Sequence, residues 1–356
     1  MRISRILPIA LAALVSIGLV GCSNAGSSAD SAPDATADTA NTFPVTIDHA
    51  FGQTVIEKKP ERVASVAWAN HEVPIAMGIV PVGMAKVTWG DDDGNGVLPW
   101  VEDALSDLGV DTSKLGDEAA EKAGEVPVLF DESDGIDFEA IADSKPDVIL
   151  AAYSGITKED YETLSKIAPV VAYPDTPWAT PLDEVIRMNA AALGAKQEGE
   201  ELVNKLDGEI TTAFDAHQKL VGAKVLFAYI DPSDLSQVGY YTAADPRTGF
   251  LLQHGMAAPQ EVANNSDSEE FYLSVSSENV DVFNDVDLIV TYGDDSLLKA
   301  LQADPLLSKI PAVAEGRVAV LADNTPLAAS AIVSPLSIAW GLEEYFDLLE
   351  APLRNQ

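Results

Sequence analysis

Hydrophobic residues in the segment 196–220 recur three and four positions apart, as they do along one face of an α-helix. At about 1.5 Å per residue, such a helix would be about 37 Å long, roughly the width of one small domain. Segments typical of buried strands alternate with helical patterns on both sides of it. This arrangement predicts an α/β fold of two doubly wound lobes joined by a single long bridging helix, with the working site in the cleft between the lobes. The face of the helix that turns inward is predicted to carry Leu202, Leu206, Ile210, Ala213, Phe214 and His217.

Each lobe has its own series of predicted elements. An alternating segment at 43–57 is typical of a β-hairpin, and the elements after it call for a largely parallel sheet with helices on both faces. The second lobe is expected to repeat this plan. In the first lobe, strands are predicted at 62–68, 80–85, 126–130, 147–153 and 170–173, and helices at 70–77, 100–108, 137–144 and 158–168. In the second lobe, strands are predicted at 224–230, 287–292 and 318–322, and helices at 249–255, 278–283, 296–303 and 335–349.

The N-terminal segment has the features of an export signal. Arg2 and Arg5 precede an apolar run at 6–20 that is too short to span a bilayer comfortably. The run leads into Leu-Val-Gly-Cys22, a bacterial lipobox whose thiol receives a diacylglycerol. Because Cys22 is the only cysteine of the chain, lipidation also explains an unpaired thiol on an exported protein. Acyl chains on Cys22 would hold the protein at the outer face of the cytoplasmic membrane, which suits a bacterium with a single membrane.

Small and polar residues fill the segment after Cys22, and this composition is typical of a flexible tether. The remaining residues suffice for two domains of ordinary size, each with a substantial core. The predicted organisation is a signal peptide (1–21), a lipidated tether (22–42), a first lobe (43–195), the bridging helix (196–221) and a second lobe (222–356).

Acidic residues greatly outnumber basic ones, with 57 Asp and Glu against 21 Lys and Arg and a formal net charge of −36. This balance argues against nucleic acid as a partner. The sequence contains no Gly-x-Ser-x-Gly elbow, no phosphate-binding glycine loop and no cysteine nucleophile, so a secreted enzyme is the remoter alternative. The four histidines are scattered along the chain, which argues against a histidine-rich metal site.

Two similar blocks, one in each lobe, place an acidic residue at the start of a predicted helix. Glu139 precedes a strand that begins Asp-Val-Ile-Leu, and Glu278 precedes one that begins Asp-Leu-Ile-Val. The helix dipole favours a glutamate at such a position, so each residue has a purely local role as an alternative to a functional one.

Several motifs in a fixed order resemble one family. They are the lipobox, PERVASV at 60–66, PVG at 81–83, FEAIADSKPDVIL at 138–150, the bridging helix, and SSENV followed by DLIV in the second lobe. Together they resemble the iron–siderophore substrate-binding proteins of bacterial ABC importers, class III binding proteins related to the ferrichrome and vitamin B12 binders. The resemblance implies a monomer whose shallow cleft holds a ferric siderophore and delivers it to a membrane permease. It also implies that Glu139 and Glu278 dock against arginines of the permease.

A siderophore surrounds its iron with its own oxygens, so the protein needs no metal ligand or cofactor and binds the organic shell. Aromatic side chains supply contact area for flat chelating groups, and a cation offsets negative oxygens. The loops after the strands are the expected positions. Core packing is the alternative for any single aromatic residue, and Lys86 and Arg187 are weaker candidates for the cation. The candidate ligand-binding residues are Trp68, His71, Trp89, Tyr153, Trp178, Tyr229, Tyr240, Arg247 and Tyr272.

Because haem binders offer Tyr or His to iron, and several tyrosines are available here, a binder of haem or cobalamin is the nearer alternative function. The histidines and tyrosines of the sequence do not by themselves separate these ligands from a ferric siderophore.

One acidic loop matches the EF-hand pattern D-x-[DN]-x-[DN]-G-x5-E. Asp91, Asp93, Asn95 and Glu102, with the carbonyl of Val97, would supply the oxygens for a structural Ca²⁺. The segment before the loop is typical of a strand instead of a helix, and the loop contains a proline and a tryptophan. A solvated acidic turn is therefore the alternative.

Overall fold

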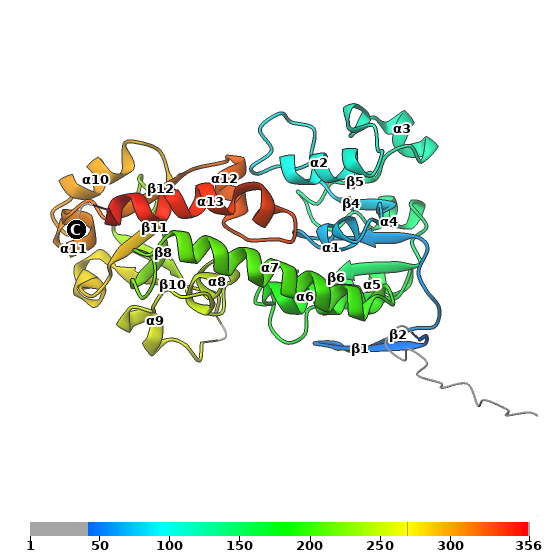
Figure 1. Ribbon diagram of the computed structural model, residues 1–356, viewed down its shortest axis with the longest axis horizontal. Coiled ribbons are helices and arrows are strands. Elements are labelled where there is room, and N and C mark those ends of the chain that lie inside the picture. The colour runs from blue at the N-terminus through cyan, green and yellow to red at the C-terminus, as the bar shows by residue number, and fades with distance from the viewer. Residues whose placement is uncertain (1–41, 269, 355–356) are drawn as a thin grey trace, which may run out of the picture. The chain divides into compact units, whose positions relative to one another are not determined.

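Two five-stranded sheets lie on either side of a long helix, α7 (Lys196–Ala216), which runs between them (Figure 1). The computed structural model describes residues 42–354 apart from residue 269. The described residues all belong to one compact unit. The predicted signal peptide and the tether with Cys22 lie outside the described residues. No helix in the described part of the chain has both the length and the apolar character needed to cross a membrane.

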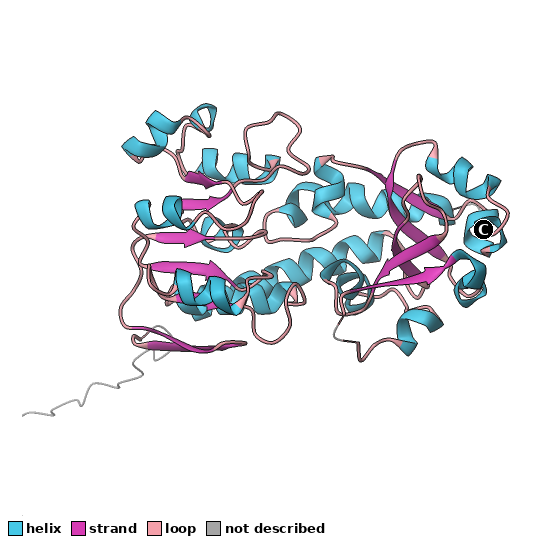
Figure 2. Ribbon diagram, turned by 180° about the vertical axis from the view of Figure 1, so that it is seen from behind, coloured by secondary structure: helices cyan, strands magenta, loops and turns pink. Residues whose placement is uncertain are grey.

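The sheet of the first lobe is wholly parallel, with strand order β5-β4-β3-β6-β7. Its carboxyl ends point toward the second lobe (Figure 2). The predicted hairpin at the start of the lobe is present as a separate antiparallel pair. The strands are β1 (Val45–His49), β2 (Gly52–Ile56), β3 (Val63–Ser65), β4 (Gly83–Ala85), β5 (Val128–Phe130), β6 (Val148–Ala151) and β7 (Val170–Ala172). The helices are α1 (Glu72–Ala76), α2 (Pro99–Asp107), the 3₁₀ helix η2 (Thr112–Lys114), α3 (Glu118–Ala123), α4 (Phe138–Asp143), α5 (Lys158–Leu164) and α6 (Leu182–Ala192).

The sheet of the second lobe is mixed: its three predicted strands, β8, β11 and β12, are parallel as expected, and two further strands extend it. Its order is β10-β9-β8-β11-β12, and β9 and β10 run antiparallel to their neighbours. The sequence pattern missed both of these strands. The strands are β8 (Val225–Tyr229), β9 (Gln237–Tyr241), β10 (Tyr272–Ser276), β11 (Leu288–Gly293) and β12 (Val318–Ala322). The helices are α8 (Pro246–Gln253), α9 (Gln260–Asn264), η3 (Ser277–Phe283), α10 (Leu297–Ala303), η4 (Leu307–Lys309), α11 (Pro311–Ala314), α12 (Pro326–Ser330), α13 (Ser337–Glu350) and η5 (Ala351–Leu353).

The predicted bridging helix is confirmed, although it ends at Ala216 and not near residue 220. Its buried stripe includes Val203, Leu206, Ile210 and Phe214. The stripe packs against α6 on one side and α13 on the other. One hydrophobic cluster runs from the sheet of the first lobe, through this stripe, to the sheet of the second lobe. The helix is therefore part of a continuous core.

A second set of contacts joins the lobes away from α7. The indole Nε1 of Trp89 donates to Asp323 Oδ1 at 3.3 Å, and the amide of Gly90 donates to Asn324 Oδ1 at 2.8 Å. Gly90 has a φ of 84°, and a Cβ there would lie 2.5 Å from the Cβ of Ala329. Only glycine therefore allows this loop of the first lobe to approach α12 so closely.

A buried carboxylate lies at the junction between α1 and the segment that leads into α13. Glu72 is 1% exposed, and it accepts hydrogen bonds from Trp100 Nε1 at 2.8 Å and from the amide of Leu336 at 3.0 Å. Burial raises the pKa of Glu72 to about 7, although these hydrogen bonds oppose the rise.

The raised pKa predicts how stability depends on pH. Below pH about 4.5, the carboxyl group of Glu72 is protonated in both the folded and the unfolded protein. As the pH rises toward 7, this group ionises first in the unfolded chain, and the free energy of unfolding therefore falls. Glu72→Gln keeps a hydrogen-bond acceptor and removes this titration. We expect the unfolding free energy of the variant, relative to wild type, to rise by about 2–4 kcal/mol between pH 4.5 and 8. Urea denaturation at the two pH values measures this difference, and a constant difference would contradict the account.

Candidate functional site

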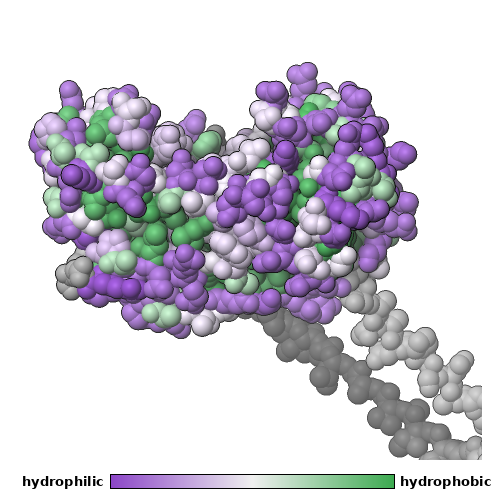
Figure 3. All heavy atoms as spheres, turned by 90° about the horizontal axis from the view of Figure 1, so that it is seen from above, coloured by the Kyte–Doolittle hydropathy of each residue, from purple (hydrophilic) through white to green (hydrophobic). Residues whose placement is uncertain are grey.

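Aromatic rings from both lobes contact one another, and a hollow is visible between the lobes (Figure 3). The ring of Trp89, from the loop after β4, lies 6.4 Å from that of Trp68, from the loop after β3. It also lies 5.3 Å from the ring of Tyr292, near the end of β11, in an edge-on contact. Within the second lobe, Tyr241 and Tyr272 are 5.5 Å apart. Trp68, Trp89 and Tyr292 therefore lie at or beyond the carboxyl ends of their strands, as expected for a ligand site in α/β folds, whereas Tyr272 begins β10.

The loop that carries Trp68 has a strained backbone. Ala67 and Ala69, on either side of Trp68, have φ values of 59° and 60°, in the left-handed region that non-glycine residues seldom occupy. Asn70, which is fully buried, holds the loop by donating to the carbonyls of Val66 and Tyr153 at 2.9 and 2.8 Å. The cost of this strain is offset by these contacts, and the result is a fixed position for the indole.

A carboxylate of the first lobe faces the same loop. Glu132, in the loop after β5, accepts a hydrogen bond from the amide of Ala67 at 2.9 Å. Burial raises the pKa of Glu132 to about 7, because this one hydrogen bond does not compensate for the lost solvation.

Arg247 is held rigidly at the start of α8. Its Nε and Nη2 donate to the two carboxylate oxygens of Asp245 at 2.8 and 2.7 Å, and its guanidinium lies 3.6 Å from the centre of the Tyr241 ring. Asp245 is 1% exposed. Bidentate pairing and stacking both favour arginine over lysine at this position. The cation presented by the second lobe is thus already paired with a buried carboxylate.

Trp178 and Tyr153 form the side of the site nearest α6. Their rings meet edge-on at 5.4 Å. Trp178 has a φ of 60°, and its indole lies over Gly155, where a Cβ would come within 2.0 Å of Nε1. Burial raises the pKa of Tyr153, so its phenol is neutral at physiological pH.

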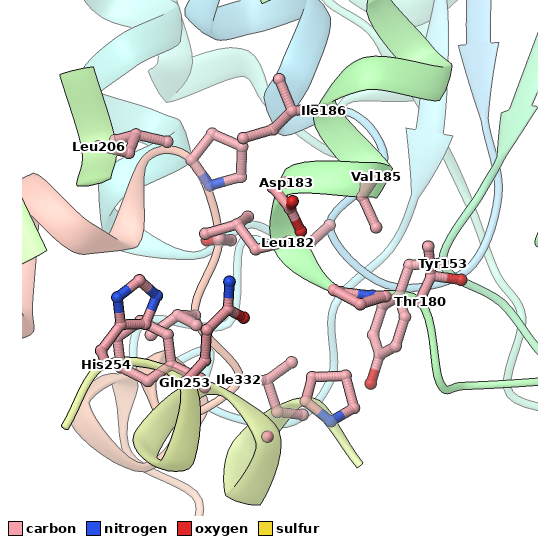
Figure 4. Close-up of a pocket in the computed structure, with 18 of the residues that line it drawn as sticks. Tyr153, Thr180, Leu182, Asp183, Val185, Ile186, Leu206, Gln253, His254 and Ile332 are labelled. Atoms are coloured by element: carbon pink, nitrogen blue, oxygen red, sulfur yellow. The ribbon is translucent and has the colours of Figure 1, made fainter. Parts of the chain in front are cut away.

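A cavity of about 360 Å³ lies beside the aromatic rings, between α6, α7 and α8 (Figure 4). It shares Ala69, Tyr153 and Asp245 with the site described above. Most of its wall is aliphatic. The wall includes Leu182, Val185 and Ile186 from α6, Val203, Leu206 and Ile210 from α7, Phe250 from α8, and Ile332 and Val333 from the segment before α13.

The structure brings six of the nine predicted ligand-binding residues to this region: Trp68, Trp89, Tyr153, Trp178, Arg247 and Tyr272. Tyr229, at the end of β8, is 47% exposed and is close enough to Tyr272 to affect its ionisation. Tyr240 is instead fully buried in the core of the second lobe, where its hydroxyl donates to Glu261 Oε1 at 3.0 Å. Its neighbour Tyr241 faces the rings, because successive residues of a strand point to opposite faces.

His71 is also buried, at 2% exposure, and lies at the N-terminus of α1. Burial lowers its pKa to about 4, so the imidazole is neutral at physiological pH. The two weaker cation candidates lie on the surface. Lys86 is exposed, and Arg187 forms ion pairs with Asp183 at 2.5 Å and Glu200 at 2.9 Å.

Sequence reasoning missed Tyr241, Tyr292, Asp245, Glu132 and Asp323. Asp245 was recognisable as the partner of Arg247, since the two residues are separated only by a proline. The two tyrosines lie in strands, and only the register of a strand decides which face a side chain occupies.

The two glutamates predicted to dock against a permease are both exposed. Glu139 lies in the first turn of α4 and Glu278 in the first turn of the 3₁₀ helix η3. Neither side chain contacts the aromatic site.

The acidic loop is closed by its own hydrogen bonds. Asp91 accepts from the amides of Gly94 and Gly96 at 2.9 and 2.7 Å, and the Asn95 side chain donates to Asp93 Oδ2 and Glu102 Oε2. In the part of the chain that the structure describes, no group of three or more His, Cys, Asp and Glu is arranged to hold a metal ion. Binding of Ca²⁺ by this loop stays a prediction for calorimetric titration.

Comparisons with known proteins bear on this site. A family model described as periplasmic binding protein matches residues 63–325. The crystal structure of PiaA from Streptococcus pneumoniae TIGR4 in complex with ferrichrome is 46% identical, with a TM-score of 0.81 over 87% of this chain and 99% of that chain. PiaA has also been solved as an iron uptake ABC transporter substrate-binding protein, with a TM-score of 0.78 and 46% identity over 88% of this chain and 100% of that chain. The Fe(3+) dicitrate-binding periplasmic protein FecB of Escherichia coli (strain K12) is 25% identical over 302 residues, 80% of this chain and 85% of that protein.

Proposed function

Because this chain belongs to the periplasmic binding protein family, we propose that it captures a ferric siderophore of the hydroxamate class between its lobes and delivers it to an ABC importer. The resemblance to iron–siderophore binders inferred from the sequence is confirmed. The family consists of binding proteins that act outside the cytoplasm, so the alternative of a secreted enzyme is set aside. The solved complex of PiaA with ferrichrome, a ferric tris-hydroxamate, supports the choice of ligand.

The charge of the site carries the argument for a hydroxamate. Ferric tris-hydroxamates are neutral, whereas ferric tris-catecholates carry three negative charges. The guanidinium of Arg247 is already paired with Asp245 through two hydrogen bonds, and two further carboxylates, Glu132 and Asp323, lie at the site. A strongly anionic ligand would therefore meet a site with no excess of positive charge, and a neutral chelate avoids this penalty.

The same residues are less suitable as ligands for haem iron. A tyrosine that ligates haem iron binds as the phenolate. Burial raises the pKa of Tyr292 to about 12 and also raises that of Tyr153, while His71 is itself only 2% exposed. These groups are better suited to pack against an organic shell than to donate to iron.

We also propose that Glu139 and Glu278 contact the permease. They lie on different lobes, both are exposed, and each is at a helix start where its carboxylate is free of the ligand site. A pair of anionic contacts, one from each lobe, would orient the cleft toward the transporter.

We propose, finally, that Cys22 is lipidated and anchors the protein to the outer face of the cytoplasmic membrane. The lipobox and the polar segment after it support this proposal. The tether would let the folded unit reach a permease in the same membrane.

Ligand titration tests the binding proposal. Tryptophan fluorescence is followed while ferrichrome, a ferric tris-catecholate, ferric dicitrate, haem or cobalamin is added. We expect ferrichrome to quench it at the lowest concentration. Trp89→Ala and Arg247→Ala should each weaken ferrichrome binding by about 1–3 kcal/mol, as expected for central contacts, whereas Arg354→Ala, an exposed arginine of the C-terminal segment, should not. Tight binding of cobalamin or haem, with no response to any ferric chelate, would overturn the proposal.

Transport assays in cells test the docking proposal. Replacing both glutamates by alanine should lower uptake of ferric hydroxamate about tenfold while the purified variant binds the ligand with unchanged affinity. Glu159→Ala is the matched control, because Glu159 is an exposed acid at the start of α5. Equal uptake by the double variant and wild type would argue against docking through these residues.

Metabolic labelling with an alkyne fatty acid tests the anchor. Wild-type protein should incorporate the label and sediment with membranes, and Cys22→Ala should lose the label completely, because the chain has one cysteine. Recovery of labelled wild-type protein in an outer-membrane fraction would contradict the proposed location.

A further inference from the structure

The cavity beside the aromatic rings is bordered mainly by residues outside the aromatic site. One end of it meets the ligand site at Ala69, Tyr153 and Asp245. Aliphatic side chains of α6 and α7 form its wall, and Figure 4 shows Leu182, Val185, Ile186 and Leu206 along it. A volume of about 360 Å³ is within the range of small-molecule sites in proteins. The cavity is thus an apolar recess that adjoins the proposed siderophore cleft.

Polar groups lie at the opposite end, where Asp183 of α6 and Asp207 of α7 line the cavity together with Gln253 and His254 at the end of α8. The carboxylate of Asp183 is paired with Arg187 at 2.5 Å. Asp207 is exposed and has no hydrogen-bond or ion-pair partner among residues 42–354 as the structure describes them. Burial lowers the pKa of His254, although Asp207 and Asp183 oppose the change, so its imidazole is uncharged at physiological pH. This end of the recess therefore carries one uncompensated negative charge.

An apolar wall with a single free carboxylate at its end complements an aliphatic chain with a terminal ammonium. A neutral alkyl group would fill the space along the wall and leave Asp207 unpaired, and a carboxylate would be repelled by Asp207. Many ferric hydroxamates carry groups that lie outside the iron-chelating shell, and such groups need space beyond the aromatic rings.

We propose that this cavity accommodates the aliphatic ammonium arm of a ferric tris-hydroxamate, with Asp207 facing the ammonium. The inference rests on the proposed function, because the chelate itself must occupy the adjoining cleft. The arm would lie along α7, between Leu206 and Phe250, and contact both the bridging helix and α8. The protein would then distinguish siderophores by their peripheral groups as well as by their iron-binding groups.

The test compares three ferric tris-hydroxamates whose iron-binding groups are alike and whose peripheral groups differ. Ferrichrome has no amine arm, ferrioxamine B has a free aminopentyl arm, and N-acetylated ferrioxamine B has the same arm without the charge. Affinities are measured by tryptophan quenching for wild type, for Asp207→Asn, and for Asp215→Asn. Asp215 lies on the same helix, is exposed and does not line the cavity, so its substitution makes the same change in net charge.

We expect Asp207→Asn to weaken ferrioxamine B binding about three- to fivefold, and to leave ferrichrome and the acetylated ligand unchanged. The loss should shrink at high salt, since a charge pair at a solvent-facing end is screened. Asp215→Asn should change none of the three affinities. An equal effect of Asp207→Asn on the free and acetylated arms, or no effect on either, would overturn this inference while ferrichrome binding still supported the proposed function. Failure of ferrichrome and both ferrioxamines to bind wild type would overturn the proposed function itself, and the arm site with it.

Discussion

The buried stripe of α7 is the contact on which the rest of the structure depends. Each sheet needs helices on its faces, and the stripe of Val203, Leu206, Ile210 and Phe214 packs against helices that belong to both lobes. A change in the angle between the lobes would have to slide this stripe against α6 or α13, and close-packed side chains resist such sliding. The relation between the lobes is therefore set by core packing and not by the length of a flexible linker.

Because core packing fixes the relative position of the lobes, residues from both lobes can form one site with a constant geometry. Trp89 of the first lobe meets Tyr292 and Asp323 of the second, and Gly90 allows the backbone of its loop to approach α12. Left-handed backbone angles at Ala67, Ala69 and Trp178 cost about 1–3 kcal/mol each and persist because the surrounding contacts hold them. They occur at Trp178 and on either side of Trp68. Strain of this kind is tolerated where the position of a side chain matters more than local stability.

The sequence was sufficient for the larger features because they depend on periodicity. The bridging helix and most strands of the first lobe have long or strongly apolar patterns, and the structure has them within a few residues. Strand β9 was missed because a glycine lies at its centre, and β10 because the alternation of Leu273 and Val275 with serines spans only five residues. The same gap led to the choice of Tyr240, whose ring lies in the core, in place of Tyr241. Without the register of β9, the two adjacent tyrosines are equivalent, and only pairing with β8 and β10 separates them.

The charge balance at the ligand site differs from the net charge of the whole chain. The net charge of −36 is spread over the surface and is screened over short distances in solution, so it does not determine what the cleft binds. At the aromatic site, the guanidinium of Arg247 stacks on the ring of Tyr241, and the buried carboxylate of Asp245 both orients and neutralises it. A guanidinium held in this way can still donate its remaining N–H groups and stack on an aromatic ring, but it contributes little net positive potential. Directional hydrogen bonding without net charge is what a neutral iron complex requires, because its outward oxygens accept hydrogen bonds while the complex as a whole gains nothing from a long-range field.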